Sequence, residues 1–129
     1  MKVAKKILFV DDDRDFLNSQ SIYFSSRGYQ VLTAESGEEA LKLLEKEVPD
    51  IMILDLMMEH FDSGFNVSKV IKERYPDLPV ILMTAIGEET GLDFRPKSVE
   101  DNRVMHADAF LDKGASPEDL FTKICELTR

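Results

Sequence analysis

The stretch Asp50-Ile51-Met52-Ile53-Leu54-Asp55 decides which fold this sequence predicts. A run of four apolar residues lies between two aspartates, which is typical of a short strand that is buried on both faces. Asp55 then lies at the carboxyl end of that strand, the edge at which open α/β sheets bind their ligands. The stretch therefore predicts a buried strand that carries a functional carboxylate.

The composition is that of one acidic globular domain. The chain has 129 residues, of which 43% are hydrophobic, and a formal net charge of −9 at pH 7. This length fits a single domain over residues 1–129 that needs no disulfide to form a core. The negative charge argues against nucleic acid or an anionic membrane as a partner, and it favours a cationic partner or a bound divalent metal.

The cysteine count and the apolar runs predict a cytoplasmic location. One cysteine allows no internal disulfide, which suits a reducing compartment. No apolar run approaches the roughly 20 residues that a transmembrane helix needs. The basic segment at residues 1–6 precedes too short an apolar run to be a signal peptide.

Short apolar runs predict further strands at residues 7–10, 29–34, 80–83 and 109–111. Strands that alternate with helices indicate βαβ units, so the sequence predicts a doubly wound α/β fold with a five-stranded parallel sheet.

Helix signals lie between these strands. Apolar residues from Phe16 onward predict a first helix that Gly28 ends, and Ser36 begins a capping box for the second. The third helix ends near Pro76. The last begins at Ser116, which is followed by a proline at the first helical position.

The alternation fails between residues 86 and 105. Gly87, Gly91 and Pro96 interrupt this segment, so the sequence predicts an irregular or shortened fourth helix, with a short helix around residues 99–104 as one option.

Polar residues follow four of the predicted strands, and in a parallel sheet these ends meet at one edge. The residues are Asp11 and Asp12, Asp55, Thr84, and Lys113. Three neighbouring carboxylates repel one another, and Mg²⁺, which prefers oxygen ligands, offsets that repulsion. A lysine and a hydroxyl beside them suit a phosphoryl group, which a carboxylate can accept as a nucleophile.

Taken together, four segments resemble the receiver domain of bacterial two-component response regulators, including the stand-alone receivers typified by the chemotaxis regulator. The segments are residues 7–13, the strand that ends at Asp55, residues 79–85 and residues 110–113. Each is a weak signal alone, but their order and spacing are highly specific. The resemblance implies a flavodoxin-like sheet with the strand order 2-1-3-4-5.

The resemblance also implies a Mg²⁺-dependent phosphorylation site. Asp55 would accept a phosphoryl group from a phosphohistidine on a sensor histidine kinase or a phosphotransfer protein. Asp11, Asp12, Asp55 and the backbone carbonyl of Met57 would hold the Mg²⁺, with Asp12 as a direct ligand.

A second implication is a conformational switch. Lys113 would pair with one phosphoryl oxygen, and Thr84 would bond to another and move towards it. Phe110 would follow as the switch aromatic. Such a protein turns over no separate substrate, so it is not an enzyme in the usual sense.

The chain departs from the family pattern in three places. Glu59 stands four residues after the acceptor, where the family usually has proline, and Gly114 replaces the proline that usually follows the lysine. The gap between Thr84 and Lys113 is also several residues longer than usual. Glycine does not favour a cis bond as proline does, so Lys113 is either held less firmly or precedes a costly cis bond.

Two other functions remain open. In one, the chain is a receiver-like binding module that no longer switches by phosphorylation. In the other, Asp11 and Asp13 resemble the nucleophile and the acid/base of haloacid-dehalogenase-type phosphatases, although Asp15 stands where that family prefers threonine or valine.

The expected partners are proteins. The sequence predicts a monomer or weak dimer whose output is contact with an unknown downstream protein, unless the chain is a fragment of a longer regulator.

Overall fold

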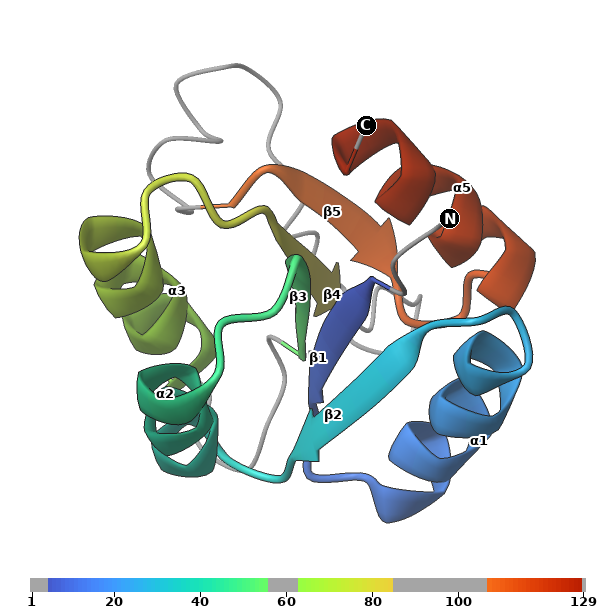
Figure 1. Cartoon of the computed structure of the whole chain (residues 1–129), viewed down its shortest axis with the longest axis horizontal. Helices are drawn as coiled ribbons and strands as arrows, with labels where there is room; N and C mark the ends of the chain where they lie inside the picture. Colours follow the sequence, from blue (N-terminus) through green and yellow to red (C-terminus); the bar gives the residue numbers. More distant parts are fainter. Residues whose placement is uncertain (1–4, 56–62, 85–106, 129) are drawn as a thin grey trace, which may run out of the picture.

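A five-stranded parallel sheet forms the centre of the computed structural model, which describes residues 5–55, 63–84 and 107–128 (Figure 1). The strand order is β2-β1-β3-β4-β5. The strands are β1 (Lys6–Val10), β2 (Gln30–Ala34), β3 (Ile51–Asp55), β4 (Val80–Thr84) and β5 (Ala109–Asp112). The predicted doubly wound sheet and its order are therefore confirmed, with strand ends within one residue of the predicted ones.

β3 lies at the middle of the sheet, as its uninterrupted apolar run predicts. All its residues are buried, and Ile53 lies in register with Phe9 of β1 on one side and with Ile81 of β4 on the other. A strand with neighbours on both edges and helices on both faces has no side chain in contact with water. Asp55 is consequently placed at the end of the most enclosed strand.

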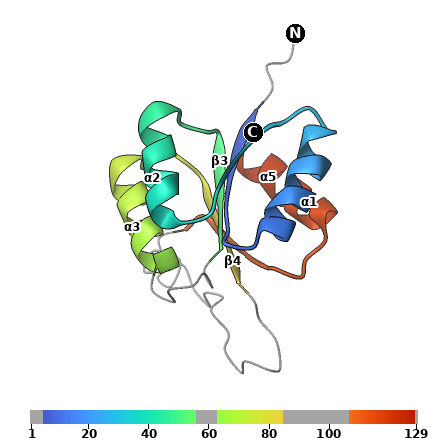
Figure 2. The same ribbon diagram turned by 90° about the horizontal axis from the view of Figure 1, so that it is seen from below.

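Helices cover both faces of the sheet (Figure 2). One face carries α1 (Arg14–Ser25) and α5 (Pro117–Leu127), and the other carries α2 (Gly37–Lys46) and α3 (Ser63–Arg74). This arrangement follows from the right-handed crossovers that join neighbouring parallel strands.

Two apolar cores follow from the alternation of side chains along the strands. Beneath α1 and α5 lie Ile7, Phe9, Leu17, Phe24, Ile51, Ile53, Ile81, Met83, Leu120 and Ile124. Beneath α2 and α3 lie Leu8, Val10, Ala34, Ala40, Leu44, Met52, Leu54, Ile71, Leu78, Val80 and Leu82. Because both cores are continuous across β1, β3 and β4, the carboxyl ends of these strands are held in fixed relative positions.

The ends of α1 are set by a polar residue and a glycine. Asp13 is the N-cap, and its Oδ1 accepts hydrogen bonds from the N–H groups of Asp15 and Phe16. At the other end Gly28 has a φ of 93°, its N–H donates to the carbonyl of Ser25, and the next N–H donates to the carbonyl of Phe24. These two bonds form a Schellman motif, so Gly28 ends the helix as predicted.

The predicted caps of α2 and α5 are also present. Ser36 accepts the N–H of Glu39, and Ser116 accepts the N–H of Asp119 with Pro117 in the first turn. The capping box of α2 differs in one detail, because the carboxylate of Glu39 accepts the N–H of Glu35. The box thus closes one residue further out than the standard pattern.

Several predicted features lie outside the described residues. These are Met57, Glu59 and the segment 86–105, for which the sequence predicts an irregular or shortened fourth helix. Within the three described ranges, no helix is long and apolar enough to cross a membrane.

Candidate functional site

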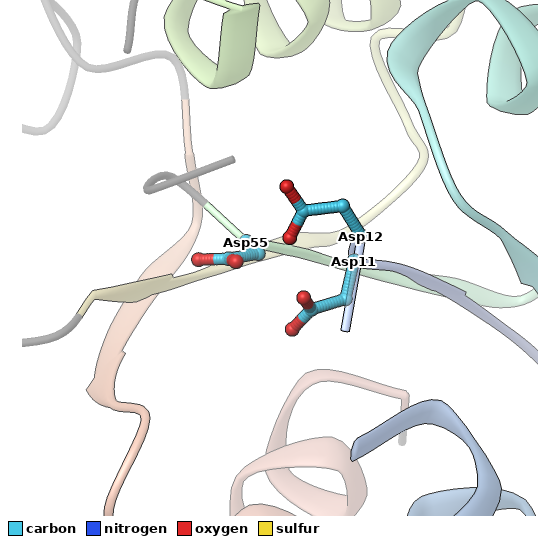
Figure 3. A group of neighbouring side chains, drawn as sticks. All are labelled: Asp11, Asp12 and Asp55. Carbon is cyan, nitrogen blue, oxygen red and sulfur yellow. The ribbon is translucent and has the colours of Figure 1, made fainter. Parts of the chain in front are cut away.

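Three carboxylates meet at the carboxyl edge of the sheet (Figure 3). Asp11 and Asp12 directly follow β1, and Asp55 ends β3. One oxygen from each lies within 4.8 Å of the other two. Asp11 and Asp55 are only 1% and 2% exposed, whereas Asp12 is exposed. The cluster therefore has two buried carboxylates and one that faces water.

Asp11 is held by the backbone on both sides. Its N–H donates to the carbonyl of Ala34 at 3.0 Å, which extends the pairing of β1 with β2. Its Oδ1 accepts the N–H of Asp13 at 2.9 Å. Its Oδ2 is buried and accepts no hydrogen bond from any described residue. One oxygen of Asp11 is thus used to shape the loop, and the other is directed at the cluster.

Burial raises the pKa of Asp11 to about 6, from an ordinary value of 3.8. The negative charge of Asp55 raises it further, while Lys113 and the N–H of Asp13 act in the opposite direction. The burial of this carboxylate outweighs its favourable contacts. A cation at the cluster would therefore relieve an electrostatic cost that the fold creates.

Lys113 bridges the two buried carboxylates. Its Nζ forms ion pairs with Asp11 Oδ2 at 2.9 Å and with Asp55 Oδ2 at 3.2 Å. The contact with Asp55 also has hydrogen-bond geometry, whereas the closer contact with Asp11 does not. Burial alone would lower the pKa of Lys113, but the two carboxylates together raise it above its ordinary value. The lysine is therefore a firmly protonated cation at the site.

A tight turn after β5 carries Lys113. The carboxylate of Asp112 accepts the N–H of Gly114 at 2.8 Å, and the carbonyl of Asp112 accepts the N–H of Ala115, also at 2.8 Å. Among the described residues no peptide bond is cis, so the bond between Lys113 and Gly114 is trans. Of the two alternatives that the missing proline left, the cis bond is thus ruled out. The turn also shows that the backbone around Lys113 is fixed by other means.

Asp13 lies beside the cluster but has another role. Both of its described bonds from N–H groups cap the N-terminus of α1. One oxygen of the Asp13 carboxylate is thus committed to the helix cap. This geometry disfavours the phosphatase alternative, which needs Asp13 as the acid/base.

The remaining predicted residues are only partly described. Thr84 ends β4 and lies in register with Asp112, beside the strand that leads to Lys113, but its side chain lies outside what the structure describes. Met57 lies outside it altogether. Phe110 is half-buried on β5, in register with Leu82, and packs against the core beneath α2 and α3.

Two features around Lys113 were not predicted from the sequence. Its Nζ lies 5.0 Å from the centroid of the Phe16 ring, a cation–π arrangement, and the Asp112 carboxylate fixes the turn. The signal for Asp112 was an aspartate two residues before a glycine, which is typical of an Asx turn. Phe16 lies in the first turn of a helix that begins at the acidic loop, and this places it at the same edge.

The arrangement suits chemistry at Asp55. A buried carboxylate beside a cationic lysine can act as a nucleophile towards an anionic group, because the lysine offsets the charge that arrives. The three carboxylates offer the oxygen ligands that Mg²⁺ prefers. A phosphoryl group and a divalent cation are therefore the ligands that match this edge.

Comparison with known proteins identifies relatives along nearly the whole chain. A family model described as the response regulator receiver domain matches residues 7–125. A probable transcriptional regulator, ycf27 of Guillardia theta, is 35% identical over 133 aligned residues, which cover 100% of this chain and 47% of that protein. The response regulator SaeR of Staphylococcus epidermidis is 38% identical over 88% of this chain and 46% of its own length. The chain thus spans about half the length of the curated relatives that it matches.

Solved structures agree with this result. A CheY-like response regulator receiver domain protein from Methanospirillum hungatei has a TM-score of 0.79 and 27% identity, over 96% of this chain and 93% of that one. The response regulator TrrA from Thermotoga maritima, solved in complex with Mg²⁺ and BeF, has a TM-score of 0.77 and 31% identity, over 95% and 98%. The family match, the sheet order and the acidic cluster at the sheet edge all point to the same family. This chain belongs to the response regulator receiver domain family.

Proposed function

We propose that this receiver domain is a phosphoryl-accepting switch in which Asp55 takes a phosphoryl group from a phosphohistidine. Receiver domains of two-component systems interact with histidine kinases, so a sensor kinase or a phosphotransfer protein is the proposed donor. The observation that carries the proposal is the position of Lys113, whose Nζ lies between the buried carboxylates of Asp11 and Asp55. A lysine with a purely structural role would be balanced by one carboxylate, whereas Lys113 contacts Asp11 and Asp55 and has Asp12 in the same cluster.

The reaction at Asp55 is a transfer between two nucleophiles. A carboxylate oxygen of Asp55 attacks phosphorus, a new P–O bond forms, and the P–N bond to the donor imidazole breaks with its electron pair returning to nitrogen. The product is an acyl phosphate on Asp55. Lys113 stabilises the charge on the phosphoryl oxygens. Hydrolysis of the acyl phosphate returns the domain to its resting state, so no separate substrate is turned over.

Mg²⁺ is the proposed cofactor. Asp11, Asp12 and Asp55 offer oxygen donors on one edge, with the backbone carbonyl of Met57 as the fourth proposed ligand. The buried Asp11 Oδ2 has an ion pair with Lys113 as its described contact, and it is also an oxygen donor of the kind that a hard cation prefers. When bound, Mg²⁺ supplies positive charge that offsets the charge of the transferring group. The TrrA structure with Mg²⁺ and BeF supports the same assignment here.

The output of the switch is a change in protein contacts. Thr84 is proposed to bond to the phosphoryl group and Phe110 to follow its movement. The downstream protein is unknown, and we propose a cytoplasmic monomer or weak dimer. Because the longer relatives include a protein named as a transcriptional regulator, the prediction of no nucleic-acid partner concerns residues 1–129 alone.

Phosphorylation by a small donor tests the proposal. The purified protein is incubated with Mg²⁺ and acetyl phosphate or phosphoramidate and then weighed by intact mass spectrometry. We expect a phosphate-sized gain that requires Mg²⁺, is absent in Asp55→Ala and Asp55→Asn, and persists in Asp13→Asn. Asp13→Asn is the matched control because it removes an acidic charge from the same loop.

Other outcomes would support the rival functions. A folded protein that binds Mg²⁺ but gains no mass, from these donors or from a phosphorylated histidine phosphotransfer domain, would favour a phosphorylation-independent binding module. A gain in mass that persists in Asp55→Ala but is lost in Asp11→Ala would identify Asp11 as the nucleophile and support the phosphatase hypothesis.

A further inference from the structure

We propose that Phe16 and Asp112 are positioning residues that together hold the Lys113 ammonium over the Asp11 and Asp55 carboxylates. This inference rests on the proposed function of Lys113, but it concerns how the side chain is held. Lysine has a flexible four-carbon stem, so a fixed ammonium needs support along the chain as well as at its end. In this protein that support comes from two elements, the turn after β5 and the first turn of α1.

Asp112 fixes the backbone from which Lys113 projects. Its carboxylate accepts the N–H of Gly114 and its carbonyl accepts the N–H of Ala115, so hydrogen bonds to one residue close the turn around Lys113. The first of these bonds exists only because position 114 has an N–H group, which a proline would lack. The carboxylate of Asp112 thus supplies the restraint that a ring at position 114 would otherwise provide.

The ring of Phe16 fixes the other end of the side chain. Lys113 Nζ lies 5.0 Å from the ring centroid, while the ring itself packs against the core beneath α1 and α5. The ring face attracts the ammonium and limits its movement. Phe16 is in turn held by α1, because the carboxylate of the N-cap Asp13 accepts the N–H of Phe16. The N–H of Asp13 itself donates to Asp11 Oδ1. Hydrogen bonds through Asp13 therefore connect the loop that carries the acidic pair to the residue whose ring faces the lysine.

Both supports can be tested without any phosphorylation. Lys113 Nζ lies over the Phe16 ring, so the neighbouring ε-methylene protons should show a ring-current shift in the NMR spectrum of the metal-free protein, and this shift reports the position of the side chain. In Phe16→Leu no ring remains to shift these protons, so the relaxation order parameter of the Lys113 ε-carbon is measured there instead, and we expect it to fall below the wild-type value. The ring-current shift itself should be kept in Phe16→Tyr. We also expect it to be reduced in Asp112→Ala, where the ring is untouched, and kept in Asp112→Asn, which retains the amide oxygen as an acceptor.

Gly114→Ala is the matched control for the turn. A Cβ at this position would lie 3.4 Å from Asp112 Oδ1, an ordinary contact, and the N–H that Asp112 accepts would remain. Gly114→Ala should therefore keep the wild-type Lys113 shift. Asp112 is exposed and Phe16→Leu preserves an apolar side chain, so both disruptive variants should fold.

The rate of phosphorylation by acetyl phosphate provides the second measurement. We expect about a two- to fivefold loss in Phe16→Leu and about a two- to tenfold loss in Asp112→Ala, with Phe16→Tyr and Asp112→Asn near wild type. In a Lys113→Ala background neither change should lower the rate further, because the residue through which both act is gone. A merely structural role would give the same loss in both backgrounds.

Two results would overturn the inference. One is a wild-type order parameter of the Lys113 ε-carbon in Phe16→Leu together with a wild-type ring-current shift in Asp112→Ala. The other is an equal loss of the shift in Asp112→Ala and Asp112→Asn, because it would assign the effect to charge instead of the turn. If the wild-type protein takes no phosphoryl group, the proposed function fails, yet the NMR comparison still decides whether these residues position Lys113.

Discussion

Lys113 Nζ lies closer to Asp11 Oδ2, at 2.9 Å, than to the proposed phosphoryl acceptor Asp55, at 3.2 Å. The positive charge of Lys113 therefore offsets two negative charges. One belongs to Asp11, which the fold buries at an electrostatic cost, and the other belongs to Asp55, which is proposed to react. The raised pKa of Asp11 shows that this offset is incomplete. The resting site consequently holds more negative charge than its own cation balances, and this imbalance leads to the predictions that follow.

Neutralising Asp11 should stabilise the metal-free protein. We expect Asp11→Asn to raise the free energy of unfolding at about pH 7.5 by about 1–3 kcal/mol, since the rise in pKa from 3.8 to about 6 corresponds to roughly that cost. Asparagine keeps an oxygen that can accept the N–H of Asp13. Urea denaturation in the presence of a chelator measures the difference. A variant less stable than wild type would show that the ion pair between Asp11 and Lys113 outweighs the cost of burying the carboxylate.

The advantage of Asp11→Asn should depend on pH with a defined sign. Because the folded-state pKa of Asp11 is raised, the folded protein binds this proton more tightly than the unfolded chain does. Protonation therefore stabilises the wild type at low pH, and this stabilisation is lost as the pH rises through about 6. We expect the difference between variant and wild type to be small below about pH 4, to grow up to about pH 6 and to be constant above it. A difference independent of pH would contradict the raised pKa.

Mg²⁺ should distinguish Asp12 from its neighbour Asp13. A ligand that binds only the folded state raises stability by mass action, about 2.7 kcal/mol at one hundred times its dissociation constant. We expect Asp12→Asn to lose most of the Mg²⁺-dependent increase in Tm. Asp13→Asn should keep it, because Asp13 caps α1 and asparagine caps as well as aspartate. Equal losses in the two variants would mean that the loop responds only to its total charge.

Removing Lys113 should strengthen the binding of Mg²⁺. The ammonium and the metal compete for the same buried oxygens, so we expect Lys113→Ala to lower the Mg²⁺ dissociation constant by about five- to tenfold. Isothermal titration calorimetry measures it. Lys123→Ala is the matched control, since it removes the same charge from α5, where Lys123 pairs with Glu126. Unchanged affinity in Lys113→Ala would show that the lysine does not occupy the metal's ligands.

The features that sequence predicted well are those that local chemistry determines. The apolar run before Asp55 is a strand buried on both faces, as its pattern predicted. Gly28 ends one helix and Ser36 begins another through hydrogen bonds to residues close in the chain. Asp11 and Asp55 came together because parallel strands end at one edge. Each of these conclusions depends on residues that are close in the chain or on one rule of topology.

The features that sequence left open depend on contacts between distant segments or on a local competition. The bond after Lys113 is trans, as is usual before a non-proline residue, but the hydrogen bond by which the Asp112 carboxylate closes the turn could not be predicted from the missing proline. The contact of Lys113 with Phe16 joins two residues from opposite ends of the chain, and only packing of α1 against the sheet creates it. The raised pKa of Asp11 likewise results from burial by the folded chain, which cannot be predicted from a short sequence motif.

Lys113 should matter more for the response to phosphorylation than for phosphorylation itself. In Lys113→Ala the nucleophile and the acidic cluster remain, so we expect acetyl phosphate to modify Asp55 completely but more slowly. Without the ammonium, nothing at position 113 ties the phosphoryl group to β5, and the change should not reach Phe110. Phosphorylation should therefore shift the backbone amide resonance of Phe110 in the wild type and leave it in place in Lys113→Ala. The resonance of Cys125 on α5 serves as an internal reference. A normal phosphorylation-dependent shift of Phe110 in Lys113→Ala would mean that the signal reaches β5 without the lysine, with the Thr84 end of β4 as the remaining route.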